Sequence, residues 1–439
     1  MKRVAVIGSG ISGLSAAWQL SASGQEALVT LFEAGEHFGG HANTVDLTLD
    51  GVTHGVDTGF LVYNERTYPN LVQLFDELQV DVAPADMSFS VQVPRADGQA
   101  GLEWSGSSLN SVFAQRRNLL RPRFIGMLAD ILRFNRLTTE LAEQGAETAL
   151  QQTISEFLDT HGFGATFRQD YLLPMIGCIW SCPTDQMLRF PIATLIRFCH
   201  NHGLIQVTNR PQWYTVRGGS RQYVNRMLRR LHDARLRCPV QAIQRHDDGV
   251  WVQSAHGNER FDAVVFACHS DQALALLGAD ASADERAVLG AIRYQPNIAV
   301  LHTDASVLPS RRRAWAAWNY ERAADQGQEQ AGVCLHYLIN QLQPIPWQQP
   351  VIVSLNPTRP IAEQHVHQRI EYAHPVFDLA AIQAQRRVGE LQGQRRTWFC
   401  GAWCGYGFHE DGLKSGLSAA KAVARALPRL DRTPLRVVA

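Results

Sequence analysis

The stretch RVAVIGSGISGLSAAWQLSASG, at residues 3–24, joins a β-branched apolar run to a helix-like run through three glycines. These are Gly8, Gly10 and Gly13, which have the spacing G-x-G-x-x-G. At this spacing the first glycine makes a tight turn, the second lets another group approach the backbone, and the third lets the helix pack on the strand. The stretch therefore predicts a strand, a turn and a helix that ends near Gly24.

A second apolar run, ALVTLFEAG at residues 27–35, ends in Glu33 and Ala34. In dinucleotide sites an acidic residue at this distance from the glycines accepts hydrogen bonds from ribose hydroxyls, and the phosphates lie at the helix N-terminus. We therefore predict a dinucleotide site that contains the three glycines, Glu33 and Ala34, with Ile11 and Ser12 at the start of the helix.

The same N-terminus also has features of an export signal. It has a basic start, a short apolar run and small residues at Ala16 and Ala17. Cleavage there would remove the first strand and helix of the predicted site. We therefore favour the cofactor site over the export signal.

The composition is that of a globular protein with more than one domain. The chain has 439 residues, of which 45% are hydrophobic, and 41 basic residues balance 41 acidic ones. A zero net charge argues against a generally basic nucleic-acid binder, so we expect no nucleic-acid partner. Eight cysteines are too few for a disulfide framework at this length. We expect a cytoplasmic protein without a membrane-spanning helix, and peripheral membrane attachment stays open.

Four further segments carry a resemblance to a known family. They are HFGGHANTVDLTLDGVTHGVDTGF at residues 37–60, WYTVRGGSRQ at 213–222, the run around Val240, and RRTWFCGAWCGYGFHEDGLKSG at 395–416. In this order they resemble the flavin amine oxidase superfamily, which includes amine oxidases, protoporphyrinogen oxidases and carotenoid desaturases. The strongest resemblance is to the FAD-binding oxidoreductases associated with cyclopropane fatty-acid synthases.

This resemblance implies bound FAD and a set of residues near it. His41 departs from the family, which commonly has arginine at this position, so a charge contact there is not implied. The implied cofactor-binding residues, besides those of the glycine turn, are Gly39, Gly40, His41, Asp57, Thr58, Gly59, Phe60, Gly218, Gly219, Val240, Gly401, Asp411, Gly412 and Leu413.

The same segments predict the architecture. We expect the α/β class, with a Rossmann-type FAD-binding domain that is discontinuous in sequence and a second α+β substrate domain. Runs broken at Asp248–Gly249 also predict a hairpin. The predicted FAD-binding domain comprises residues 1–80, 210–290 and 395–439, and the substrate domain comprises 81–209 and 291–394.

Candidate catalytic residues come from GYGFHEDG, because the resemblance places this turn beside the flavin ring. Tyr406 and Phe408 could pack on the ring, and His409 and Glu410 could supply acid–base groups. Asp411 could contact the flavin or could cap the last helix.

Two departures from the amine oxidases concern the substrate. Asn297 stands where those enzymes have lysine, and Leu413 is nearest the position of a cage tyrosine. The resemblance therefore implies oxidation or desaturation of an apolar substrate, such as a lipid or fatty-acyl chain, by hydride transfer to flavin N5. An amine oxidase, and a flavin-bearing partner of a lipid-modifying synthase without turnover of its own, stay open as alternatives.

Two other features of the sequence bear on metal and membrane binding. Cys178 with Cys182, and Cys400 with Cys404, have spacings that zinc sites also use, but neither pair has a second matching pair beside it, so we predict no metal site. Residues 113–137 combine six arginines and one acid with many apolar residues. This segment predicts either a core helix or an element that binds an anionic membrane surface.

Overall fold

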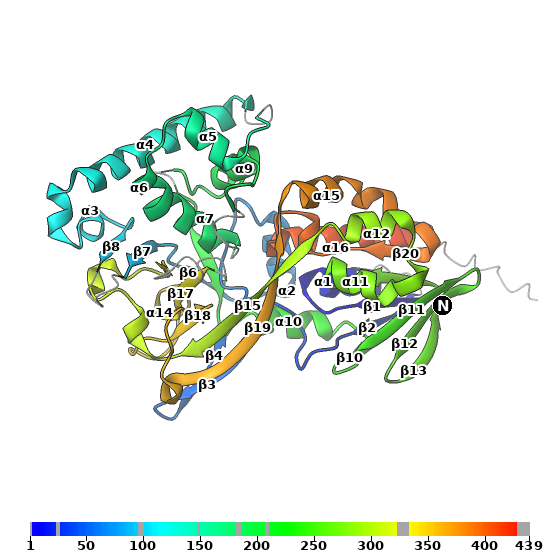
Figure 1. Cartoon of the computed structure of the whole chain (residues 1–439). Helices are drawn as coiled ribbons and strands as arrows, with labels where there is room; N and C mark the ends of the chain where they lie inside the picture. Colours follow the sequence, from blue (N-terminus) through cyan, green and yellow to red (C-terminus); the bar gives the residue numbers. More distant parts are fainter. Residues whose placement is uncertain are drawn as a thin grey trace, which may run out of the picture.

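The computed structural model describes residues 2–22, 27–94, 101–146, 150–180, 187–206, 210–322 and 333–427. A five-stranded parallel sheet with the order β10-β2-β1-β14-β20 organises one half of the molecule (Figure 1). Strands from the beginning, middle and end of the chain therefore pair directly, and the predicted α/β class is confirmed. The strands are β1 (Lys2–Ile7), β2 (Ala27–Phe32), β10 (Asp233–Arg235), β14 (Ala263–Phe266) and β20 (Thr397–Phe399).

Helices cover both faces of this sheet. Successive residues of a strand point to opposite faces, so Val4 and Val6 join one buried cluster while Ala5 and Ile7 join another. The first cluster contains residues of α1 and α16. The two helices pack so closely that a Cβ on Gly416 would lie 2.1 Å from the Ser12 carbonyl oxygen, so this position requires glycine. The helices are α1 (Ile11–Ala22) and α16 (His409–Ala426) on the first face, and α11 (Ser270–Leu277), α12 (Ala283–Leu289) and α15 (Leu379–Leu391) on the second.

A three-stranded antiparallel sheet packs beside the second face. The predicted hairpin is confirmed, because His246 pairs with Gly249 across the turn. Ile243 and Val252 bury their side chains in the same cluster as Ala5 and Ile7. The strands are β11 (Val240–His246), β12 (Gly249–Ser254) and β13 (Gly257–Phe261).

A seven-stranded sheet forms the other half of the molecule, with the order β19-β15-β18-β17-β16-β7-β8 (Figure 1). All its neighbours are antiparallel except β16 and β7. Its long outer pair, β15 and β19, reaches toward the parallel sheet (Figure 1). The strands are β7 (Phe89–Val93), β8 (Leu102–Ser105), β15 (Arg293–His302), β16 (Trp318–Glu321), β17 (Cys334–Leu338), β18 (Ile352–Leu355) and β19 (Val366–Val376).

A group of helices lies beside β7, β8 and β16 (Figure 1). The longest, α4, starts at Pro122, as expected for proline in the first turn of a helix. Its buried residues are Phe124, Met127, Phe134, Asn135 and Thr138. The helices are α3 (Leu109–Val112), α4 (Pro122–Glu143), α5 (Ile154–Thr160), α6 (Ala165–Phe167), α7 (Leu173–Trp180) and α9 (Ile192–Asn201), and a 3-10 turn at Arg116–Leu120 precedes α4.

Shorter elements connect the two halves. A hairpin of β3 and β4 contacts the second half, where the Trp347 indole donates to the Leu49 carbonyl at 3.1 Å. A small sheet has the order β5-β9-β6. The remaining elements are β3 (Thr44–Leu49), β4 (Val52–Asp57), β5 (Tyr63–Asn64), β6 (Val82–Ala85), β9 (Trp213–Val216), α2 (Pro69–Leu78), α10 (Arg221–Leu228) and α14 (Ile339–Leu342).

One helix of the predicted substrate range packs beside the parallel sheet. Helix α15 falls in the predicted substrate range 291–394, but it packs on α12 and β20 in the cluster beneath the parallel sheet. Within the described part of the chain, no helix combines the length and the apolar character required to cross a bilayer.

Candidate active site

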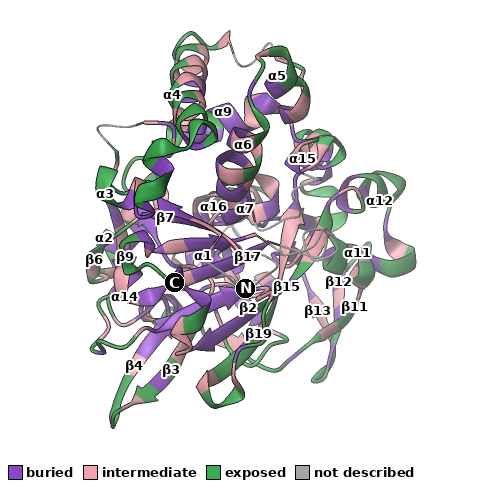
Figure 2. Cartoon of the chain, turned by 60° about the vertical axis from the view of Figure 1, so that its left-hand side comes forward, coloured by how far each residue is buried: buried purple, intermediate pink, exposed green. Residues whose placement is uncertain are grey.

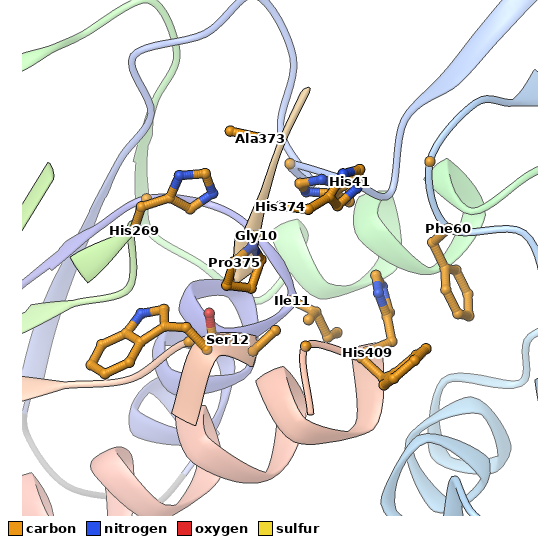
Figure 3. Close-up of a pocket in the computed structure, with 18 of the residues that line it drawn as sticks. Gly10, Ile11, Ser12, His41, Phe60, His269, Ala373, His374, Pro375 and His409 are labelled. Atoms are coloured by element: carbon orange, nitrogen blue, oxygen red, sulfur yellow. The ribbon is translucent and has the colours of Figure 1, made fainter. Parts of the chain in front are cut away.

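A cavity of about 680 Å³ lies between the parallel sheet and the second half of the molecule. Its lining includes Ile7, Phe32, Ala267 and Gly401, which are at or just beyond the carboxyl ends of β1, β2, β14 and β20. Parallel sheets commonly bind ligands at this edge. Figure 3 shows the turn before α1, part of β19 and the start of α16 around the same space.

The glycine turn between β1 and α1 leaves room for a ligand at one position. Gly8 has φ +99°, which favours glycine. A Cβ on Gly13 would lie 1.9 Å from the Gly8 carbonyl oxygen, so glycine is required for the helix to pack on the turn. Gly10 differs, because a Cβ there would meet no atom within 4 Å although Gly10 lines the cavity.

Glu33 connects the end of β2 to this turn. Its Oε2 accepts hydrogen bonds from the Ser9 backbone N–H at 2.9 Å and the Ser9 hydroxyl at 2.5 Å. Its Oε1 accepts from the Gly35 N–H at 2.7 Å. A carboxylate oxygen can accept more than one hydrogen bond, so the half-buried Glu33 can also receive a hydroxyl from the cavity.

Gly39 and Gly40 continue the cavity wall beside Gly10. Gly39 donates to the Ser9 carbonyl at 3.1 Å and forms a parallel bridge with Gly10. A Cβ on Gly40 would lie 3.1 Å from the Gly10 Cα. The two segments therefore form one narrow backbone cradle.

His41 places a buried polar atom in this cradle. Its Nε2 has no hydrogen-bond partner among the described residues, and its ring stacks on Tyr372 at 4.7 Å. Burial, and then the proximity of His374, lower the pKa of His41 well below its usual value. Thr58 supports this wall from behind, since its hydroxyl lies 2.9 Å from the Tyr372 hydroxyl. An unpaired buried donor or acceptor such as His41 Nε2 normally finds a ligand or water partner.

These features fit a dinucleotide. The open Gly10, the N-terminus of α1, the Glu33 carboxylate and the unpaired His41 nitrogen all lie along one wall of the cavity. Backbone N–H groups at a helix N-terminus favour phosphate, and an acid at the end of the second strand favours ribose.

Asp57 lies outside the cavity lining. Its carboxylate accepts from the Thr44 hydroxyl at 2.6 Å, from the Ser220 N–H at 2.9 Å, and from the Gln343 amide at 2.9 Å. Burial, which outweighs these hydrogen bonds, raises the pKa of Asp57 to about 6. Gly218 and Gly219 form the turn beside it, where a Cβ on Gly219 would lie 2.3 Å from a Thr44 carbon. These residues therefore stabilise the segments next to the cavity wall without lining the cavity themselves.

The start of α16 and the turn before it contribute three aromatic side chains to the cavity: Tyr406, Phe408 and His409. His409 stacks on Phe60 with ring centroids 3.8 Å apart (Figure 3). Its Nε2 lies 2.6 Å from the Tyr223 hydroxyl. Burial lowers the pKa of His409 to about 3, so the ring is neutral near pH 7. A base with so low a pKa abstracts protons poorly, and His409 serves as a wall of the cavity.

Glu410 and Asp411 point elsewhere. The Glu410 carboxylate accepts from the Asn70 and Leu71 backbone N–H groups at 3.0 Å each, at the start of α2. Asp411 accepts from the Tyr406 and Phe408 N–H groups at 3.0 Å each and so fixes the turn before α16.

The predicted site residues therefore fall into two sets. Those in the cavity lining are Gly8, Gly10, Ile11, Ser12, Glu33, Ala34, Gly39, Gly40, His41, Gly59, Phe60, Val240, Gly401, Tyr406 and His409. Those that support the lining from behind are Gly13, Asp57, Thr58, Gly218, Gly219, Glu410, Asp411, Gly412 and Leu413.

Sequence reasoning missed His374 on β19, which lies beside His41 in the cavity (Figure 3). Asn297 does not line the cavity, but its Nδ2 donates to His374 Nδ1 at 2.8 Å while its Oδ1 accepts from Asn356 at 2.6 Å. His374 therefore carries its proton on Nε2, and burial lowers its pKa to about 4. No local pattern marks His374, because it is brought to the cavity by strand pairing.

The end of the cavity away from the glycine turn is aromatic and apolar. Its wall comes from α7, α9, β16 and β17, none of which the sequence assigned to a site. His202 stacks on Phe198 at 4.0 Å and donates through Nδ1 to the Phe198 carbonyl at 2.9 Å. Burial lowers its pKa to about 4. Other residues of this wall are Met87, Ile179, Trp180, Leu204, Trp318 and Tyr337.

A buried charged cluster lies in the second sheet, outside the cavity lining. Ligand atoms of Glu321, Cys334 and His336 lie within 4.8 Å of one another, which a metal ion could use. However, Arg359 donates to both oxygens of Glu321 at 2.7 and 3.0 Å, and Gln92 donates at 2.9 Å. The positive charge of the Arg359 guanidinium would repel a metal ion bound at Glu321. We therefore interpret the cluster as an ion-pair network. Of the four cysteines whose spacing zinc sites also use, Cys178, Cys400 and Cys404 are free thiols, and Cys182 lies outside the described residues.

Comparisons with known proteins agree with a cavity that fits a dinucleotide cofactor. The profile of the family described as flavin containing amine oxidoreductase matches residues 11–305. AofH of Mycobacterium tuberculosis strain H37Rv, provisionally named a flavin-containing monoamine oxidase, is 26% identical over 277 residues. That alignment covers 60% of this chain and 56% of AofH, so the chain spans about half the length of the curated relatives it matches.

Solved structures show the same fold along nearly the whole chain. A protein of Exiguobacterium sp. 255-15, provisionally named a protoporphyrinogen oxidase, has a TM-score of 0.67 at 16% identity, with 97% of this chain and 99% of that chain covered. Putrescine oxidase bound to putrescine has a TM-score of 0.65 at 15% identity, with 97% and 99% covered. A CLA-producing fatty acid isomerase from P. acnes has a TM-score of 0.64 at 16% identity, with 97% and 98% covered.

The family match includes α1, the cradle of Gly39 and Gly40, and the hairpin after Val240. The family match confirms the superfamily expected from the sequence. It also confirms FAD as the cofactor, because members of this family bind FAD. The chain belongs to the flavin-containing amine oxidoreductases, a family of oxidoreductases whose members bind FAD.

Proposed function

We propose that the protein is an FAD-dependent oxidoreductase that oxidises or desaturates an apolar substrate of the lipid or fatty-acyl type. The observation that carries this proposal is the aromatic and aliphatic wall at the far end of the cavity. Burial of hydrocarbon against such a wall is favourable by roughly 25 cal/mol per Å² of apolar surface. A long acyl chain would gain the most from it.

The charge of the lining favours a neutral substrate over an amine. Among the lining residues that the structure describes, Glu33 is the sole carboxylate, and it lies at the glycine turn. Buried cations need a paired charge, and the far end of the described lining offers none to an ammonium group. His202, His374 and His409 have pKa values lowered to about 4, 4 and 3 by burial, so their rings add no charge at neutral pH.

When bound, FAD would supply the hydride acceptor, and the residues around it would position the substrate and exclude water. The cradle of Gly10, Gly39 and Gly40, with Glu33 and His41, would hold the cofactor. Phe408 stacks on Phe198 at 4.9 Å and joins the turn before α16 to the aromatic wall. The substrate would thus be held in a dry space beside the cofactor wall.

The fold by itself does not choose the substrate. Solved structures of this fold include a fatty acid isomerase as well as putrescine oxidase. The preference for an acyl substrate therefore rests on this chain's own lining.

A surface of exposed apolar residues suggests how a lipid substrate would be approached. We define the α3–α4 surface as Leu109, Leu119, Leu120, Ile125 and Leu132, which are 79%, 52%, 88%, 43% and 60% exposed. It lies on the helical group far from the N-terminus (Figures 1 and 2). Exposed arginines on the same segment are Arg116, Arg117, Arg121, Arg123 and Arg136.

A surface that combines apolar and basic residues is suited to bind an anionic membrane. Leucines would enter the interface while each arginine near anionic headgroups adds about 1 kcal/mol. We therefore propose reversible attachment of the α3–α4 surface to anionic lipid. No other stretch of the described chain has as many large apolar side chains exposed close together in sequence.

One experiment tests the proposed reaction. The purified yellow protein is mixed anaerobically with an acyl phospholipid, or with putrescine as an amine probe, and flavin absorbance is followed. Bleaching by the phospholipid supports the proposal. Bleaching by the amine alone supports an amine oxidase. Persistent yellow colour with both, together with a tight complex with a cyclopropane fatty-acid synthase, supports a flavin-bearing partner protein instead.

A further inference from the structure

The proton of His374 is placed by a chain of two side-chain amides. Asn356 Oδ1 accepts from the Ile298 backbone N–H at 2.9 Å, so Asn356 Nδ2 is the atom that donates to Asn297 Oδ1 at 2.6 Å. Asn297 Nδ2 then donates to the Gln295 carbonyl at 3.0 Å and to His374 Nδ1 at 2.8 Å. A backbone N–H can only donate and a carbonyl can only accept, so both ends of the chain require the same amide orientation. His374 Nδ1 is therefore an acceptor, and Nε2 carries the proton.

The Nε2–H of His374 is the group that remains for a ligand. His374 is half-buried and lines the cavity. Its Nε2 has no hydrogen-bond partner among the described residues, yet it does not belong to their fully buried unpaired atoms. This nitrogen therefore keeps accessible surface. Because Asn297 occupies the Nδ1 side of the ring, the N–H is reached from the cavity side.

His374 lies at the cofactor end of the cavity. Its ring centroid is 5.1 Å from that of His41, which directly follows Gly40 in the cradle. A Cβ on Gly40 would lie 3.1 Å from the Gly10 Cα, next to the start of α1. Figure 3 shows His269, His374 and His41 around the turn that contains Gly10. Phosphate groups favour the N-terminus of a helix, so His374 lies beside the place expected for the diphosphate of FAD.

We propose that His374 donates its Nε2–H to a diphosphate oxygen of bound FAD, and that Asn297 is the positioning residue that keeps the proton on this nitrogen. The described lining of the cavity contains no lysine or arginine. Neutral donors must therefore satisfy the phosphate oxygens along this lining, and hydrogen bonds to charged acceptors are the strong ones. The inference concerns the cofactor and does not depend on the proposed acyl substrate.

Asn297 is needed because a neutral histidine has two tautomers. With the proton on Nδ1, His374 would present a lone pair to the phosphate oxygens and repel them. The Asn297 amide donates to Nδ1 and so excludes that form. It also opposes protonation of the ring, in agreement with a His374 pKa that burial lowers to about 4. The chain thus fixes a neutral donor in one orientation before FAD binds.

The same part of the molecule offers two matched controls. Asn340 Nδ2 donates to two backbone carbonyls at 3.0 Å each, and its Oδ1 accepts from the Val351 N–H at 2.8 Å. His302 is a buried histidine on β15, like Asn297, and its Nε2 lies 2.6 Å from the Ser354 hydroxyl. Neither Asn340 nor His302 lines the cavity.

The first measurement is the Kd of FAD, from the flavin fluorescence released when the FAD-loaded protein is diluted. In His374→Phe the Kd should rise about 10- to 100-fold, the loss expected for one hydrogen bond to a charged group. His374→Gln keeps an N–H donor and should stay within about threefold of the unmodified protein. The phosphorus NMR signals of bound FAD should shift in His374→Phe. In His302→Gln both the Kd and the phosphorus signals should stay unchanged.

The second measurement is nitrogen NMR of the protein labelled at histidine, with the His374 signals identified by their loss in His374→Gln. In the unmodified protein His374 should show a protonated Nε2 and an unprotonated Nδ1. Asn297→Asp replaces the donor by a carboxylate that only accepts, so Nδ1 should become protonated. Asn340→Asp makes the same change outside the cavity lining and should leave the His374 signals as they are.

Each result decides one part of the inference. An unchanged Kd in His374→Phe, an equal loss in His374→Phe and His374→Gln, or unshifted phosphorus signals would refute the bond to the diphosphate. A protonated Nδ1 in the unmodified protein, or an unprotonated Nδ1 in Asn297→Asp, would refute the role of Asn297. A failure of phospholipids to bleach the flavin would affect the proposed substrate and leave these measurements unaltered.

Discussion

The Glu410 carboxylate ties the first turn of α16 to the first turn of α2, because it accepts hydrogen bonds from the Asn70 backbone N–H at 3.0 Å and from the Asn70 side-chain amide at 2.5 Å. An acid at this position satisfies N–H groups that have no partner within the helix. His409, one residue earlier, faces the cavity. Adjacent residues at the start of α16 thus have different tasks.

Replacing Glu410 by glutamine should therefore lower stability and leave the chemistry intact. One of the two carboxylate oxygens becomes an NH₂ group that faces a backbone donor. We expect a loss of about 1 kcal/mol in the free energy of unfolding. Urea unfolding measures it, and the rate of flavin reduction should stay unchanged. A normal stability with a strongly reduced reduction rate would return Glu410 to the catalytic residues.

His409→Ala should give the opposite result. It removes the ring that stacks on Phe60 and opens the cavity wall, so we expect slower flavin reduction and a shifted flavin spectrum at nearly normal flavin content. Stopped-flow reduction and the absorption spectrum are the measurements. Reduction at the normal rate would mean that the wall formed by His409 does not position the substrate.

Gly10→Val and Gly13→Val should separate cofactor binding from folding. A Cβ at Gly10 would meet no protein atom within 4 Å, so the variant should fold but lose at least about tenfold in FAD affinity. A side chain at Gly13 would collide with the Gly8 carbonyl, and this variant should not fold stably. Circular dichroism and flavin content after purification distinguish the two. Normal flavin content in Gly10→Val would refute the assignment of the cradle.

The flavin should be bound without a covalent link. Denaturation of the FAD-loaded protein should release all the yellow colour into the soluble fraction. Colour that stays with the precipitated polypeptide would indicate attachment, and peptide mapping around His41 and the cysteines would then locate it.

Glu321 should make stability depend on pH. Burial alone would raise its pKa, but hydrogen bonds from His336 and Arg359 lower it to about 2, against an ordinary value of 4.5. Its ionised form therefore stabilises the fold above about pH 4.5, and this contribution is lost as the pH falls toward 2. Glu321→Gln leaves Arg359 and His336 without their partner and should cost about 3 kcal/mol near pH 6.

Urea unfolding at pH 6 and at pH 3 tests this dependence, and the difference between the variant and the unmodified protein should shrink at the lower pH. Burial alone would lower the pKa of His336, but Cys334 and Glu321 raise it to about 9. The protonated His336 therefore adds stability below pH 6.5, and this contribution is lost as the pH rises through 9. Glu363→Gln is the control, because Glu363 forms an exposed ion pair with Arg369. An equal loss of stability in both variants would contradict the buried network.

The α3–α4 surface should bind anionic but not zwitterionic vesicles. Leu119→Ser with Leu120→Ser should reduce co-sedimentation, and Arg121→Glu with Arg123→Glu should abolish it, with FAD content unchanged in both. Leu379→Ser is the control, because Leu379 is 58% exposed and lies on α15. Binding should weaken with added salt as surface charges are screened. Equal binding to both vesicle types, or none to either, would refute the membrane surface.

The glycine turn, Glu33 and the strand–helix pattern could be predicted from the sequence because they depend on local interactions. The tight turn here requires glycine for local steric reasons, and an acid at the end of the next strand, which pairs with the first, lies at a fixed distance from it. The same holds for Pro122 at the start of α4 and for the hairpin turn before Gly249. Local conformation and short sequence spacing carry this information.

Tertiary structure alone decided which side chains reach the cavity. His374 comes from β19, Trp180 from the end of α7 and Trp318 from the start of β16, and they line one cavity only because distant segments pair and pack. Glu410 and His409 are adjacent polar residues in the sequence. Because α16 packs against α2, the Glu410 carboxylate lies at the start of α2, while His409 lines the cavity. The orientation of a side chain depends on its neighbours in space, and a sequence without those neighbours cannot specify it.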